Sequence, residues 1–169
     1  NAYFNQRDGD DEGTRLVDFN GDGSVDVYDT QARQLWLNNG NGWTISNDWQ
    51  LNNLPASIAF SHDDEGVRIP DLNGDGLSDV IQAKGDLRST YINIGEGWQF
   101  DNEWNAPAVA QFVENNGDNE GTRLVDINGD GSVDIVRIER QGGALPFGLA
   151  WKNKAIKQYL LKEITLPEG

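Results

Sequence analysis

Three stretches of the chain share one spacing of oxygen-bearing side chains. Each has the pattern Asp-x-Asn-Gly-Asp-Gly-x-x-Asp, and the three copies begin at Asp18, Asp71 and Asp126. Carboxylate or amide oxygens therefore stand at positions 1, 3, 5 and 9, with glycines at positions 4 and 6. Hard divalent cations such as Ca²⁺ take about six to eight oxygen ligands, which a local segment supplies only by curling around the ion. The glycines permit the positive φ angles of such a curl.

The pattern predicts three calcium sites, one in each loop. The expected ligands are the side chains at positions 1, 3, 5 and 9 and the backbone carbonyl at position 7. They are Asp18, Asn20, Asp22, Ser24 and Asp26; Asp71, Asn73, Asp75, Leu77 and Asp79; and Asp126, Asn128, Asp130, Ser132 and Asp134. The alternative is three turns without an ion, because Asn, Asp and Gly are ordinary turn residues. Nine aspartates at fixed offsets favour the ion, since without a cation their charges would repel one another.

The loops match the calcium loop of an EF-hand only in their first half. An EF-hand loop needs a bidentate Glu at position 12 and a helix on each side. Position 12 here is Asp29, Gln82 or Arg137, and the flanking segments are short and β-prone. We therefore expect the loops to connect strands.

A longer repeat surrounds each loop. The tetrapeptide that begins at Glu12 returns at Glu65 and Glu120, each time as Glu-Gly-Thr/Val-Arg. Regular periods of this kind indicate solenoids, propellers or other arrays. The expected organisation is a single repeat domain, 1–169, with units at about 12–64, 65–119 and 120–153 and an exit segment at 154–169. We expect the arginine of each tetrapeptide to pair with its glutamate or a nearby aspartate; a ring of cations facing a partner is the alternative.

Each unit is expected to form four short strands. In the first unit the alternating segments are 14–18, 25–29, 34–38 and 43–46, with Asn-Gly-Asn-Gly turn residues before the last. The predicted fold is all-β, with three tandem four-stranded β-propeller blades. A closed propeller has about four to eight blades, so three form a partial propeller or part of a larger or oligomeric one. Residues 157–166 fit either a strand or a short helix. The insertion at 141–148 is either a binding loop or drift near the end of the array.

Composition excludes several classes of function. The net charge of −15 argues against nucleic acid, whose phosphates require Lys and Arg. The sequence contains no run of 18 apolar residues, the length needed to span a membrane. The absence of Cys excludes disulfides and thiol chemistry. Loops of this kind bind calcium at about 10⁻⁴–10⁻³ M, which favours an extracellular or secreted location. The chain lacks Met, which suggests a processed or excised piece of a longer protein.

The units resemble FG-GAP/VCBS repeats, the calcium-loop blades of integrin-type propellers, and the similarity extends over nearly the whole chain. The segments 15–18, 35–38 and 42–43 are further similar to the repeats of bacterial Rhs/YD-repeat proteins and Tc-toxin B components. The tail 159–169 resembles the opening of an Rhs shell. The resemblance implies a docking or gating module of a toxin-delivery protein.

Two functions follow from these observations. The first is a calcium-stabilised module that interacts with other propeller blades or protein subunits. The second is a propeller lectin that binds glycans by stacking sugars on its repeated tryptophans; the alternative is that these fill space between sheets. The tryptophans concerned are Trp43, Trp49, Trp98 and Trp104. An enzyme is not expected, because the sole histidine, His62, lies in a polar loop and adjacent Ser-His-Asp residues do not make a triad.

Overall fold

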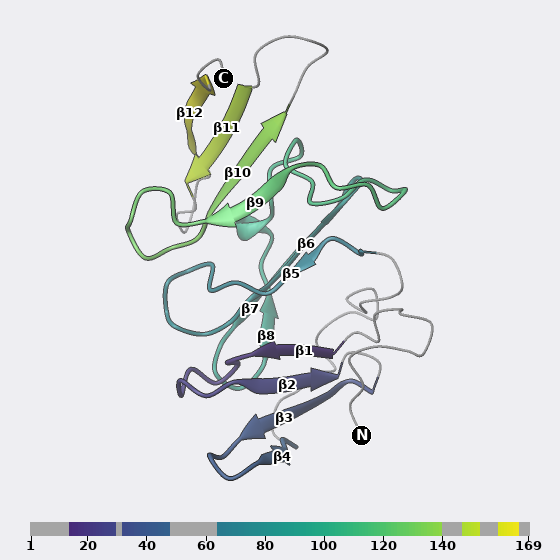
Figure 1. The fold of residues 1–169 in the computed structure, drawn as a ribbon, viewed down its shortest axis with the longest axis vertical. Helices are drawn as coiled ribbons and strands as arrows, with labels where there is room; N and C mark the ends of the chain where they lie inside the picture. Colours follow the sequence, from purple (N-terminus) through teal and green to yellow (C-terminus); the bar gives the residue numbers. More distant parts are fainter. Residues whose placement is uncertain (1–13, 30–31, 48–63, 140–146, 153–158, 166–169) are drawn as a thin grey trace.

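The computed structural model of the chain describes residues 14–29, 32–47, 64–139, 147–152 and 159–165. These residues form three antiparallel sheets of four strands each, with strand orders β1-β2-β3-β4, β5-β6-β7-β8 and β12-β11-β10-β9. The sheets follow one another along the long axis of the molecule (Figure 1). The predicted all-β class is therefore confirmed.

The strands follow the alternating segments of the sequence. The first sheet contains β1 (Thr14–Val17), β2 (Asp26–Asp29), β3 (Gln34–Asn38) and β4 (Trp43–Ile45). The second contains β5 (Val67–Arg68), β6 (Val80–Lys84), β7 (Leu87–Asn93) and β8 (Trp98–Phe100), followed by the 3₁₀ turn η3 (Asn102–Trp104). The third contains β9 (Thr122–Val125), β10 (Asp134–Glu139), β11 (Phe147–Lys152) and β12 (Tyr159–Thr165).

Each aspartate-rich loop connects the first two strands of its sheet. In the first sheet Val17 pairs with Asp26, so the loop begins and ends at one rung of an antiparallel pair. Val125 and Asp134 form the same rung in the third sheet. The loops therefore lie between strands, as expected, and all three lie along the same side of the array (Figure 1).

The apolar core lies between the sheets. One cluster joins residues of the first unit to residues of the second: Phe19, Tyr28, Leu35, Val67, Val80 and Trp98. The ring of Phe19 meets Trp98 edge-on, with centroids 5.7 Å apart and planes at 87°. A second cluster joins the second unit and its connecting segment to the third: Leu72, Ile81, Ala83, Trp104, Ala106, Ala110, Phe112 and Ile135. Each sheet is thus stabilised mainly by its neighbours, as in other repeat proteins.

The third sheet includes a segment that was expected to leave the array. β12 pairs with β11 in antiparallel register, from Lys152 opposite Tyr159 to Phe147 opposite Thr165. The ambiguity between strand and helix at 157–166 is therefore resolved as a strand, and 159–165 belong to the third sheet. Most of the 141–148 insertion, together with Trp49 and His62, lies outside the described residues.

Among the described residues, no helix has the length and apolar character needed to cross a membrane.

Candidate metal-binding loops

The aspartate at position 1 closes each loop. In the first loop one carboxylate oxygen of Asp18 accepts the N–H of Gly21 and the other that of Gly23, both at 2.8 Å. Asp71 and Asp126 bind the glycines at positions 4 and 6 of their own loops in the same way, at 2.7–2.9 Å. The N–H of position 6 is also the main reason that the pKa of Asp126 lies below its ordinary value. The loop backbone therefore favours the ionised form of the Asp126 carboxylate.

The side chains at positions 3 and 5 are hydrogen-bonded to each other in the first two loops. In the first loop the amide oxygen of Asn20 accepts the N–H of Asp22 at 3.1 Å, and its amide nitrogen donates to the Asp22 carboxylate at 3.0 Å. The second loop repeats both bonds. Asp22 also accepts the N–H of Ser24 at 2.7 Å, and this bond is the largest cause of its lowered pKa. In the third loop the side-chain amide of Asn128 donates instead to the carboxylate of Asp134, at 2.7 Å.

Position 9 differs from the other three side-chain positions because it is fully buried in all three loops. In the second loop one carboxylate oxygen of Asp79 accepts the N–H of Leu72 at 2.8 Å, and the other accepts the N–H of Asn93 at 2.7 Å. Asp26 makes the equivalent pair of bonds in the first loop, at 2.9 and 2.8 Å. In the first two loops the position 9 carboxylate therefore connects the base of the loop to the end of the third strand of the sheet.

Burial makes Asp79 a weaker acid. Its pKa is raised to about 7, mainly by desolvation, with a smaller contribution from the negative charges of Asp75 and Asp71. The two backbone N–H groups that it accepts act in the opposite direction. A cation held by the same loop would also favour the ionised form, because an opposite charge nearby lowers the pKa of a carboxyl group.

The side chains of Asn38 and Asn93, which the sequence analysis did not select, also make hydrogen bonds to the loops. Besides its backbone bond to Asp79, Asn93 donates from its side-chain amide to the carbonyl of Phe19 at 2.8 Å and to that of Ser78 at 3.2 Å. Asn38 donates to the carbonyl of Val25 at 3.1 Å. The available signal was the Asn that follows the matched Trp36 and Tyr91 by two residues in both units.

Neighbouring loops lie against each other. A Cβ atom placed on Gly21 would meet Leu77 Cδ2 at 3.0 Å and the carbonyl oxygen of Gly76 at 3.3 Å. A Cβ on Gly74 would meet Ser132 Oγ at 3.3 Å. Both glycines occupy position 4 and have positive φ, 73° and 78°. Position 4 of each of the first two loops therefore touches the next loop, and only glycine fits both the conformation and the space.

The donor atoms of the loops match a hard cation by type. Each loop carries carboxylates at positions 1 and 5, an amide oxygen at position 3 and a backbone carbonyl at position 7, and oxygen ligands suit Ca²⁺ rather than Zn²⁺. Position 9 stands apart because its carboxylate is fully buried, whereas the carboxylates of positions 1 and 5, which also accept backbone N–H groups, lie nearer the surface. Among the residues that the structure describes, no three His, Cys, Asp or Glu side chains are grouped closely enough to hold a metal ion.

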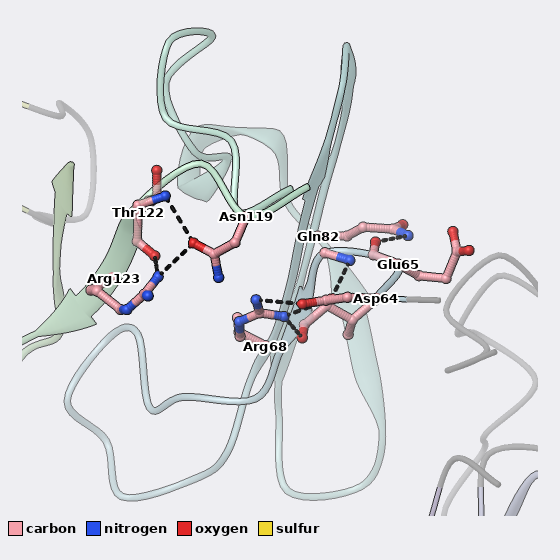
Figure 2. A network of polar contacts seen from close by, with 10 residues as sticks. Asp64, Glu65, Arg68, Gln82, Asn119, Thr122 and Arg123 are labelled. Atoms are coloured by element: carbon pink, nitrogen blue, oxygen red, sulfur yellow. Dashed lines mark hydrogen bonds and ion pairs between the residues drawn. The ribbon is translucent and has the colours of Figure 1, made fainter. Parts of the chain in front are cut away.

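Two of the repeated arginines, Arg68 and Arg123, belong to a polar network that includes no aspartate of the three loops (Figure 2). Arg68 binds both carboxylate oxygens of Asp64, at 3.0 and 2.9 Å, and Arg123 donates to Asn119 at 3.1 Å. Although burial raises it, the bonds from Arg68 and the N–H of Gly66 hold the pKa of Asp64 below its ordinary value.

The glutamates of the repeated tetrapeptide have other partners. Glu65 pairs with Lys84 at 3.0 Å, and Glu120 pairs with Arg137. The expected pairing of each arginine with its glutamate or a nearby aspartate is therefore met in the second unit, where Arg68 pairs with Asp64, whereas Arg123 of the third unit binds Asn119 instead.

An aromatic hollow of about 450 Å³ lies on the second unit. It is open to solvent and is lined by Tyr91, Ile94, Trp98, Gln99 and Phe100. The rings of Tyr91 and Phe100 meet at 61°, with centroids 5.5 Å apart. Trp98 is 2% exposed and Phe100 is 54% exposed, so the hollow has a core residue at its base and an exposed ring at its rim.

The tryptophans that were candidates for sugar stacking occupy different environments. Trp98 and Trp104 are buried in the two clusters between the sheets, while Trp43 is exposed. Two of the three that the structure describes are therefore core residues, as the alternative reading predicted.

The comparisons with known proteins concern the fold. No protein-family model matches the chain, and no curated protein matches it. Among solved structures the chain is similar to a lectin from Agrocybe aegerita, described in work on its specific recognition of non-reducing terminal N-acetylglucosamine. The TM-score is 0.60 at 21% sequence identity, and the match covers 90% of this chain and 37% of the lectin chain. At this identity the similarity supports the fold alone.

Proposed function

We propose that the chain is a calcium-binding module of FG-GAP-type β-propeller blades. In this proposal it is a structural and protein-interaction part, for docking or gating, of a larger secreted protein of the Rhs/Tc-toxin type. The observation that carries the calcium proposal is the threefold repeat of one loop at one place, between the first two strands of each sheet. Oxygen-bearing side chains stand at positions 1, 3, 5 and 9 of every copy.

Within each loop the residues have different tasks. Positions 1, 3 and 5 and the carbonyl of position 7 would hold the ion, with position 9 nearest the interior. Bound calcium would supply positive charge that offsets the carboxylates of the loop. The chain's own contribution is to hold these oxygens on one turn, through the N–H groups of positions 4 and 6 and the buried carboxylate of position 9.

The proposed role of calcium is to stabilise the fold. An ion that binds only the folded chain adds about 1.4–2.7 kcal/mol per site when its concentration is about ten- to a hundredfold above Kd. A whole domain is stable by about 5–15 kcal/mol, so three such sites would be a large part of the total. Function then depends on the surfaces that the stabilised units present to partner proteins.

Equilibrium dialysis with radioactive calcium tests the sites directly. We expect three ions per chain, and we expect Asp18→Asn, Asp71→Asn and Asp126→Asn each to remove one. Asp86→Asn, an exposed aspartate outside the loops, is the control and should leave three. Binding of no calcium by the folded wild-type chain would refute the proposal.

Carbohydrate binding is the second candidate function, favoured by the aromatic hollow and by the fold similarity to a lectin. An apolar sugar face would stack on Phe100, and Gln99 would supply hydrogen bonds to hydroxyl groups. The probe is N-acetylglucosamine, titrated into the chain with calcium present while tryptophan fluorescence is recorded. We expect a saturable change that Phe100→Ala abolishes and Leu87→Ala preserves; no change at any sugar concentration would dispose of this candidate.

A further inference from the structure

The three-unit array ends in two apolar faces. We define the leading face by Leu16, Trp43 and Ile45 of the first unit, and the trailing face by Val125, Ile127 and Ile138 of the third. All six side chains are large, hydrophobic and exposed. Six of the eleven exposed large hydrophobic side chains among the described residues belong to these two faces, and exposed apolar patches mark interaction sites.

The leading face has a buried counterpart inside the array. Trp98 occupies in the second unit the place that Trp43 occupies in the first, and it is 2% exposed because the first unit covers it. Trp43 is 53% exposed. Ile69, the counterpart of Leu16, packs against the same cluster, whereas Leu16 is also 53% exposed. The leading face is therefore the surface that a preceding unit would cover.

The trailing face has buried counterparts as well. Position 2 of the loop is Phe19 in the first unit and Leu72 in the second, and both are fully buried against the following unit. Ile127 at the same position of the third loop is 45% exposed. Ile138 corresponds to Ala83, which is fully buried. The trailing face is therefore the surface that a following unit would cover.

A polar contact across the interface between the first two units runs from the later unit to the earlier one. Asn93 donates to the carbonyl of Phe19 in the preceding unit. Asn38 stands at the corresponding place beside the leading face, and Ile127 presents the corresponding carbonyl at the trailing face. The two end faces thus carry matching halves of the contact that joins the first two units.

We propose that the leading face of one copy of this chain docks on the trailing face of a second copy. The contact is head-to-tail, and it repeats between molecules the packing that joins the first unit to the second. Such a heterologous contact leaves one unused face at each end of a dimer, so it continues until the ring closes or the row extends. The inference depends on how the sheets stack and not on the bound ion.

Complementation between two variants tests the proposal. Trp43→Asp places a charge on the leading face and Ile127→Asp places one on the trailing face. We expect the wild-type chain to form assemblies larger than a monomer in sedimentation velocity, at about 0.15 M salt, which screens the acidic chains beyond about 8 Å. Each variant alone should be a monomer. An equimolar mixture should form a dimer that grows no further, because one intact face remains on each copy.

The controls separate docking from folding and from calcium. Leu87 is 45% exposed, as Ile127 is, but it lies outside both faces. The Leu87→Asp variant should therefore assemble like the wild type. Leu16→Asp and Ile138→Asp form a second complementary pair if near-ultraviolet circular dichroism shows that one of the first pair has not folded. Sedimentation velocity runs with calcium and with chelator measure assembly, and the dialysis experiment measures calcium binding. Together they show whether the chain can lose one of these properties and keep the other.

Several results would overturn the proposal. A monomeric wild-type chain at every concentration would do so, as would mixed variants that stay monomeric. A Trp43→Asp variant that still assembles alone, while Ile127→Asp does not, would show that trailing faces meet each other rather than the leading face.

Discussion

The side-chain amide of Asn93 donates a 2.8 Å hydrogen bond to the carbonyl oxygen of Phe19, 74 residues earlier in the chain. A second bond, from Ser78 Oγ to the carbonyl of Asp18 at 2.8 Å, runs in the same direction. Both acceptors lie at the beginning of the first loop, and both donors belong to the second unit. The first loop is therefore held by the unit that follows it, and loop geometry is coupled to the stacking of the sheets.

Replacing Asn93 measures this coupling. Asn93→Ala removes the amide and leaves a buried carbonyl without its donor, which costs about 1–3 kcal/mol. Asn38→Ala is the matched control, because Asn38 makes the bonds within its own unit but lies beside an open face. Urea denaturation should show a larger loss for Asn93→Ala. Equal losses for the two variants would mean that the bond between units adds nothing.

The contact between neighbouring loops is tested by two alanine substitutions. Gly21 and Gly23 both have positive φ, 73° and 84°, so alanine is strained at either site by about 1–2 kcal/mol. Only at Gly21 does the added Cβ meet the second loop; at Gly23 nothing lies within 4 Å. We expect Gly21→Ala to lower the free energy of unfolding by more than Gly23→Ala. The reverse order would contradict the packing of the loops.

The two classes of aspartate in a loop should respond differently when calcium is chelated. Asp79→Asn replaces an oxygen that accepts a backbone N–H with an amide donor, so we expect a loss of about 1–3 kcal/mol without calcium. Asp75 also accepts a backbone N–H, from Leu77, but it is exposed, so water can replace the lost acceptor and Asp75→Asn should have little effect under the same conditions. With calcium present both should lower stability. Chemical denaturation in chelator measures both losses. Equal losses of stability in the two variants would contradict the separate role of position 9.

The ion pair of Asp64 and Arg68 predicts a small pH dependence. Because the pKa of Asp64 is lowered in the folded chain, its contribution is present above the ordinary pKa of Asp and is lost as pH falls through the folded value. The pair is partly exposed, so we expect less than about 1 kcal/mol. Asp64→Asn imitates Asn119 of the third unit and should remove this part of the acid dependence. Stability curves of the two proteins that stay parallel from neutral pH to about pH 3 would contradict it.

The sequence predicted features that depend on neighbouring residues. Alternation of apolar side chains located most strands within one or two residues, and the aspartate spacing located the loops between them. The environments of Trp43 and Trp98 could not be predicted this way, because the same local motif is exposed at the end of an array and buried inside it. The bond from Asn93 to Phe19 was also missed, since it joins residues of different units.

Position 9 shows the same limit within a single loop. Spacing groups Asp79 with Asp71 and Asp75, because all three are acidic and regularly placed. The fold separates them: Asp79 is fully buried, while the other two lie toward the surface. Burial depends on how the strands of the sheet pack around position 9, and the spacing of the acidic residues carries no information about that.

Differential scanning calorimetry of the wild-type chain, with calcium and with chelator, tests the central claim most directly. If three loops each bind calcium in the folded state only, the ion should raise Tm by about 10–30 °C, because each kcal/mol shifts Tm by about 2–4 °C at this length. The same concentration of magnesium should raise it less, since the smaller ion requires a stricter octahedral site. An unchanged Tm in saturating calcium would contradict the claim.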